Sequence, residues 1–177
     1  MLRTDATLLL IIDVQEKLAR AMHDSDFIVS NLTKMIHGAK LLHIPLILTE
    51  QVNLGPTIPD LADIVDDRPA IEKRSFSCCG ENSFMETLAE LNRKQVLIGG
   101  IECHICVYQT AMDLAAAGHD VQILADCVSS RTAMNRSIGL DRMAAEGIKL
   151  TSTEMALFEL LKVADGENIR ALSRLVK

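Results

Sequence analysis

Aromatic side chains are scarce in this chain of 177 residues, where they make up 3% of the composition and tryptophan is absent. Proteins that bind single-stranded nucleic acids stack the bases on aromatic rings. The net charge of −6 also disfavours contact with a phosphate backbone. These absences argue against a nucleic-acid partner.

Long apolar runs are missing as well. The run at residues 8–12 is too short for a membrane span or a signal-peptide core, so we expect no membrane partner. The five cysteines are odd in number and have no repeating spacing, which predicts free thiols in a reducing compartment, the cytoplasm. With 49% apolar residues, the length predicts one globular domain over residues 1–177.

Short apolar runs alternate with segments of helical periodicity along the whole chain. Runs of this kind without polar alternation are typical of parallel strands buried on both faces. The pattern predicts an α/β fold with a six-stranded parallel sheet and helices on both faces, a three-layer Rossmann-like arrangement. We expect strands at 7–14, 45–49, 70–73, 95–99, 120–125 and 148–151, and helices at 15–22, 24–42, 82–91, 104–117, 134–146, 153–163 and 167–175.

Three reactive side chains lie at the predicted carboxyl ends of strands. Asp13 follows the first strand, Lys73 ends the third, and Cys106 lies just beyond the fourth. In open parallel sheets this edge is where ligands bind. Cys106 also falls in the first turn of a predicted helix, where free N–H groups and the helix dipole would lower the pKa of its thiol. The sequence therefore predicts a nucleophilic cysteine.

Three motifs, IIDVQ, EKRSFS and GGIECHICVYQTAMDL, together resemble those of the isochorismatase-like cysteine hydrolases. The closer match is to the isochorismatase-domain-containing hydrolases of unassigned substrate. The family spacing selects Cys106, followed by Val107, over Cys103. The resemblance implies a hydrolase in which Asp13 is the base, Lys73 the cation and Cys106 the nucleophile that forms a thioester.

The resemblance further implies an oxyanion hole and a homo-oligomer. Family members carry a cis peptide before the nucleophile's helix, which here is the Ile101–Glu102 bond. The backbone N–H groups of Glu102 and Cys106 would then bind the oxyanion. The apolar C-terminal helices are candidates for a subunit interface through Leu157, Leu160, Leu161, Leu172 and Leu175.

Nicotinamidases of this family bind a metal through one aspartate and two histidines after the second strand. This chain has no histidine between His43 and His104. The departure predicts a metal-independent hydrolase without a cofactor. The resemblance to the family implies that it acts on a small amide, carbamoyl or related compound.

Several residues near the predicted site have less defined roles. Gln51, Phe76 and Tyr108 are expected to line the substrate pocket. Arg131, with the serines before it, is expected either to bind an anion or to form a structural tie or a subunit contact. Two alternatives remain for the whole chain: a non-catalytic scaffold on the same fold, and a thiol redox protein that uses Cys103 and Cys106.

Overall fold

The protein is built on a six-stranded parallel sheet, as the alternation of the sequence predicts. The computed structural model describes residues 1–65 and 69–177. The strands lie in the order β3-β2-β1-β4-β5-β6. Their bounds are β1 Thr7–Ile12, β2 Leu46–Gln51, β3 Ile71–Lys73, β4 Gln95–Ile101, β5 Asp120–Ser129 and β6 Lys149–Thr151. The crossovers place β1 and β4 side by side at the centre of the sheet.

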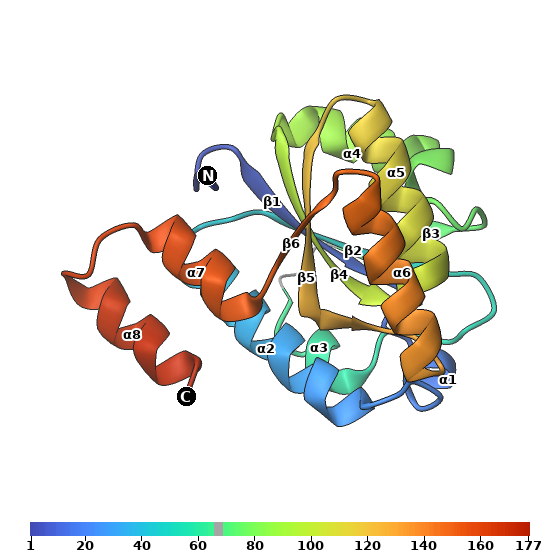
Figure 1. Ribbon diagram of the computed structural model, residues 1–177, viewed down its shortest axis with the longest axis horizontal. Helices are drawn as coiled ribbons and strands as arrows, with labels where there is room; N and C mark the ends of the chain where they lie inside the picture. Colours follow the sequence, from blue (N-terminus) through green and yellow to red (C-terminus); the bar gives the residue numbers. More distant parts are fainter. Residues whose placement is uncertain (66–68) are drawn as a thin grey trace.

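Both faces of the sheet are covered by helices (Figure 1). Successive residues of a strand point to opposite faces, so Leu9 and Ile11 of β1 join one apolar cluster while Leu8 and Leu10 join the other. The first cluster is covered by α2 (Ser25–Leu41), α7 (Thr153–Leu161) and α8 (Glu167–Leu175). The second is covered by α4 (Asn82–Leu91), α5 (Tyr108–Ala116) and α6 (Ala133–Ala145). Burial on both faces explains why the central strands lack polar alternation.

The leucines of the C-terminal helices lie inside the subunit, which contradicts the prediction that they form an interface. Leu157 and Leu172 are fully buried and Leu160 is 3% exposed. Leu161 and Leu175 pack against the same core cluster. Their apolar pattern reflects packing of α7 and α8 against α2. A close approach of α2 to α7 is possible because Gly38 faces Leu157 without a side chain of its own.

Strand β5 is longer than its sequence indicates. The polar residues from 126 onward predict a loop, yet the strand continues to Ser129. Its pairing with β4 shifts register, from Ile98 opposite Ile123 to Gly100 opposite Val128. The irregularity lets the second half of β5 reach the carboxyl end of β4.

The connections near the predicted site contain short helices. Residues 15–22 form only one turn, α1 (Glu16–Ala19), and the loop of residues 50–68 contains α3 (Pro59–Ala62). The last three residues of that loop, 66–68, lie outside the described residues. Gln15 joins the two segments because its side chain donates to the carbonyl oxygens of Gln51 and Gly55. None of the described helices combines the length and apolar character needed to span a bilayer.

Candidate active site

The carboxyl edge of the sheet brings Asp13, Lys73 and Cys106 together. Asp13 directly follows β1, Lys73 is the last residue of β3, and Cys106 lies in the π-helical turn η2 (Cys103–Val107) that precedes α5. Their exposed fractions are 0%, 1% and 6%. Polar side chains that are this deeply buried are stable only when they are paired. The arrangement is therefore a compact group of three interacting polar side chains.

An ion pair joins the first two members of this group. Lys73 Nζ lies 2.7 Å from Asp13 Oδ2, and neither side chain is exposed to solvent. Thr49 Oγ1 donates to Asp13 Oδ1 at 2.8 Å, which fixes the other oxygen of the carboxylate. The Cys106 thiol lies close enough to the Asp13 carboxylate for each group to shift the pKa of the other. Asp13 thus connects the cation with the thiol.

Gln51 and Phe76 support Lys73, a role that differs from the one expected of them. Lys73 Nζ donates to Gln51 Oε1 at 2.6 Å and to the Phe76 carbonyl oxygen at 3.1 Å. A third acceptor is the carbonyl of Ser75, also at 3.1 Å. Three acceptors and one carboxylate hold the ammonium group in place. The Phe76 side chain itself is 56% exposed.

Tyr108 begins α5, two residues after the nucleophile. Its ring lies under the Arg142 guanidinium, 4.8 Å from the guanidinium carbon to the ring centroid. This cation–π contact joins α5 to α6. The roles of Gln51, Phe76 and Tyr108 in a substrate pocket stay predictions.

The structure contradicts the prediction that the resting thiol has a lowered pKa. Burial and the neighbouring Asp13 carboxylate raise the pKa of Cys106 to about 12, and the opposing effect of Lys73 is smaller. Lys73 does not compensate because its ammonium group is already paired with Asp13. Burial also raises the pKa of Asp13 above its ordinary value, against the effects of Lys73 and Thr49. The resting site holds a protonated thiol beside a carboxylate that is a stronger base than usual.

The peptide bond between Ile101 and Glu102 is cis, at the position that the family resemblance implies. The Glu102 backbone lies close enough to the Cys106 thiol to lower its pKa, against the larger effect of burial. Glycine is required just before this bond, since a Cβ on Gly100 would lie 2.2 Å from the Ile12 carbonyl oxygen. The Gly100 φ of +125° is also unfavourable for other residues. The geometry places a backbone donor against the nucleophile.

Two further residues belong to this neighbourhood, and the sequence assigned no role to either. Thr49 pairs with Ile12 in the sheet, so its hydroxyl group lies within hydrogen-bond distance of Asp13, the next residue of the chain. The only sign of this contact in the sequence is a polar residue near the end of a buried strand. Cys78 is fully buried, and its backbone N–H donates to Thr110 Oγ1 at 3.0 Å. Burial raises the pKa of Cys78 to about 12. Within residues 1–65 and 69–177, no group of His, Cys, Asp and Glu side chains is arranged to hold a metal ion.

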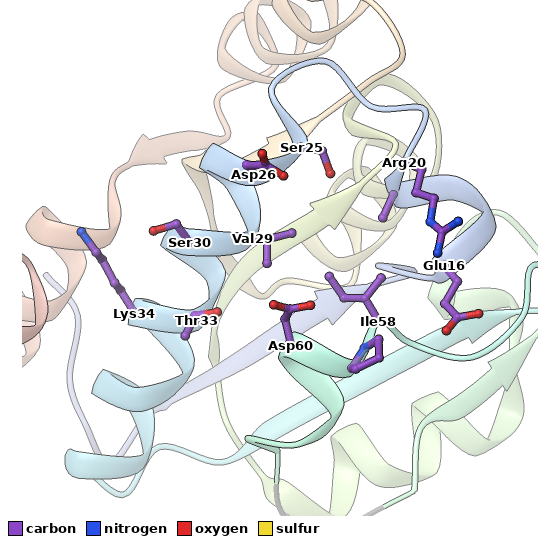
Figure 2. A pocket seen from close by; sticks show the side chains of 12 residues that line it. Glu16, Arg20, Ser25, Asp26, Val29, Ser30, Thr33, Lys34, Ile58 and Asp60 are labelled. Atoms are coloured by element: carbon purple, nitrogen blue, oxygen red, sulfur yellow. The ribbon is translucent and has the colours of Figure 1, made fainter.

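A separate groove of about 700 Å³ lies between α1, α2 and α3 (Figure 2). Charged side chains of both signs line it, among them Glu16, Arg20, Asp26 and Asp60. Figure 2 shows Asp60 facing the α2 side of this groove, with Glu16 and Arg20 at the α1 side. Asp13, Lys73 and Cys106 are not among its lining residues. The groove is therefore distinct from the site at the sheet edge.

Comparison with known proteins defines the class of the molecule. The solved structure of MAR1 ribonuclease from Caenorhabditis elegans is 31% identical and superposes with a TM-score of 0.93, covering 99% of this chain and 91% of that one. The fold is that of the isochorismatase-like hydrolases.

Sequence comparison leads to the family. The Isochorismatase domain matches residues 7–155. Isochorismatase domain-containing protein 2 of Danio rerio is 34% identical over 99% of this chain and 89% of that protein. The secreted isochorismatase effector Isc1 of Phytophthora sojae is 33% identical over 97% of this chain and 85% of that protein. The chain belongs to the isochorismatase family, whose members are typically hydrolases.

Proposed function

We propose that the protein is a metal-independent cysteine hydrolase that cleaves a small amide, carbamoyl or related compound. The observation that carries this proposal is the buried ion pair of Asp13 with Lys73, at 2.7 Å, beside the Cys106 thiol. A charged pair in a dry site is costly to maintain for stability alone. Its position beside a nucleophilic side chain fits a catalytic use.

The first step is acylation of the thiol. Asp13 accepts the Cys106 proton as the sulfur adds to the substrate carbonyl, so that no free thiolate accumulates beforehand. The C–S bond forms while the carbonyl electron pair moves to oxygen, where the N–H groups of Glu102 and Cys106 bind it. Collapse of this adduct returns the Asp13 proton to the departing amine and leaves a thioester. Lys73 keeps Asp13 ionised at rest by pairing with it.

The second step is hydrolysis of the thioester. Asp13, ionised again, takes a proton from water, whose oxygen adds to the acyl carbon. The proton then returns to the sulfur as the C–S bond breaks, which releases the acid and regenerates Cys106. Every proton in this cycle passes through one carboxylate, and the raised pKa of Asp13 suits it to that work.

The name of the C. elegans neighbour raises RNA as a second substrate class. The net charge of −6 and the scarcity of aromatic side chains favour a small molecule instead. An RNA oligonucleotide therefore belongs in the assay as a comparison, and cleavage of it would overturn the substrate class proposed here.

Screening small amides, carbamoyl compounds, esters and imides with the wild type and with Cys106→Ala tests the proposal. We expect the wild type to turn over at least one compound and the variant to lose that turnover. Turnover that persists in Cys106→Ala would refute the cysteine mechanism. No turnover by the wild type would favour the scaffold alternative, and a Cys103–Cys106 disulfide found by mass spectrometry would favour the redox alternative.

Assembly and location complete the proposal. We expect a homo-oligomer in the cytoplasm, with no membrane or nucleic-acid partner. Met134 and Ile138 on the outer side of α6 are 69% and 51% exposed, which makes them better interface candidates than the buried C-terminal leucines. Light scattering after size-exclusion chromatography measures the assembly, and a monomeric mass would contradict it.

A further inference from the structure

The Glu102 carboxylate has no role in the mechanism above, although its backbone does. Its side chain is 8% exposed. Oε1 lies 3.4 Å from Arg131 Nε, and Oε2 accepts a hydrogen bond from the Arg131 backbone N–H at 3.3 Å. A carboxylate buried to this extent needs such partners to remain charged. Both partners come from the connection between β5 and α6.

The Arg131 backbone that binds this carboxylate is itself fixed. The preceding residue, Ser130, accepts a hydrogen bond at its carbonyl from the His23 N–H at 2.9 Å. Ser129 Oγ donates to the His23 carbonyl at 2.7 Å. The end of β5 is thereby tied to the segment between α1 and α2. The Arg131 backbone N–H is therefore a fixed donor to the Glu102 carboxylate, and the Arg131 guanidinium adds an ion pair to the same carboxylate.

A second tie joins the same connection to the nucleophile's turn. Ser130 Oγ lies 2.9 Å from His104 Nδ1. Helix α6 presses against this turn as well, because a Cβ on Gly139 would lie 3.0 Å from the His104 Cα. Glu102 is thus held by Arg131, and His104 is held by the preceding residue, Ser130. Cys106 follows two residues later in the same turn.

We propose that Glu102 is a positioning residue of the oxyanion hole: its carboxylate, held by Arg131, aims the Glu102 N–H at the oxygen of the reacting carbonyl. This inference rests on the proposed cysteine hydrolase. The carboxylate and the donor N–H belong to one residue, so anchoring the side chain restricts the rotations that would turn the N–H away. Arg131 acts through Glu102 and is a positioning residue too, in agreement with its expected role as a structural tie.

Two reactions of Cys106 separate positioning of the hole from activation of the thiol. Acylation by p-nitrophenyl acetate forms a C–S bond, sends the thiol proton to Asp13, creates an oxyanion and expels p-nitrophenolate, so it uses the hole. Alkylation by iodoacetamide forms a C–S bond and expels iodide without an oxyanion. The rate of each is measured by mass spectrometry of the Cys106 peptide.

We expect Glu102→Ala to lose the most acylation rate, up to about a hundredfold, the scale of removing one oxyanion donor. Glu102→Gln and Arg131→Met each keep part of the contact and should lose about tenfold, while Arg131→Lys keeps the charge and should stay near wild type. The alkylation rate should stay within about twofold of the wild type in all four variants, because alkylation creates no oxyanion and the substitutions act on the oxyanion hole alone. Arg170→Met, which removes an exposed guanidinium from α8, is the matched control.

Parallel loss of acylation and alkylation, or acylation unchanged in Glu102→Gln and Arg131→Met, would overturn the positioning role. Should Glu102→Ala fail to fold, those two variants decide the question, because Arg131 is 65% exposed and its replacement leaves the core intact. Absence of an acylated Cys106 in the wild type would instead contradict the proposed hydrolase, so the two failures are distinguishable.

Discussion

Replacement of Asp13 by asparagine should move two properties of Cys106 in opposite directions. The Asp13 charge is one of the causes that raise the thiol pKa to about 12. At that pKa the thiol is almost wholly protonated at pH 7.4, whereas roughly 7% of an unperturbed cysteine is ionised. In Asp13→Asn the charge is removed while the Lys73 ammonium remains. The thiolate fraction should therefore rise, although the base that serves catalysis is gone.

The size of the effect follows from electrostatics. Two unit charges about 4 Å apart interact by about 4 kcal/mol at an effective dielectric constant of 20, which is equivalent to about three pKa units. We therefore expect iodoacetamide alkylation of Cys106 at pH 7.4 to become at least about tenfold faster in Asp13→Asn, with an upper limit near a thousandfold. Turnover of any substrate found for the wild type should be lost in the same variant.

The assay follows alkylation of each cysteine by peptide mass spectrometry from pH 6 to 10. Cys79, which is half-buried, serves as the internal reference, since its environment does not include Asp13. The variant should also unfold more readily, by about 3 kcal/mol or more, because Lys73 loses its buried counterion. Slower alkylation of Cys106 in Asp13→Asn than in the wild type would refute the electrostatic reasoning.

Three further predictions concern stability, each measured by urea unfolding. Gly100→Ala should lower the free energy of unfolding by about 3 kcal/mol or more, because the new Cβ would clash with the main chain of β1. Gly147→Ala, whose Cβ meets open space at a φ of +84°, should lower it by only about 1 kcal/mol. Equal losses in the two variants would contradict the packing argument. Asp126→Ala should cost about 1 kcal/mol, because both carboxylate oxygens accept from the Thr153 N–H at the start of α7, and an unchanged midpoint would contradict this capping role. The pKa of Asp120 is lowered, because its hydrogen bonds with Lys149 and Gln95 outweigh the opposing effect of burial, so the charged carboxylate stabilises the fold above pH 4 and this stabilisation is lost below it. Asp120→Asn should therefore be less stable than the wild type at pH 7 and approach its stability near pH 3. A stability difference that does not change with pH would refute this assignment.

Local patterns in the sequence were sufficient for most of the fold. The helices at 82–91 and 167–175 were predicted with the bounds that the structure has, because clear helical periodicity and flanking polar residues define them. The extension of β5 to Ser129 was missed because it depends on pairing with β4 across a register shift. A segment of this kind becomes a strand only by pairing with a neighbouring strand, and nothing in its own sequence indicates that pairing.

The three residues of the predicted site lie together in the structure, while their catalytic roles stay predictions. Asp13, Lys73 and Cys106 converge because the carboxyl ends of parallel strands share one edge. The direction of the Cys106 pKa was wrong, since the depth of burial is a property of the folded molecule rather than of a helix start. Gln51 and Arg131 were found near the site, but their contacts with Lys73 and Glu102 follow from tertiary geometry.

The position of Lys73 has a consequence for how the molecule loses its site. Its strand, β3, has three residues and lies at the outer edge of the sheet, beyond β2, while Asp13 follows the central strand β1. The edge strand is held by only a few ladder pairs, from Thr49 with Ile71 to Gln51 with Lys73. Short edge elements open locally at a free energy well below that of global unfolding. Detachment of β3 would separate the cation from the base while the central strands remain paired, so the site has a lower stability than the fold that carries it.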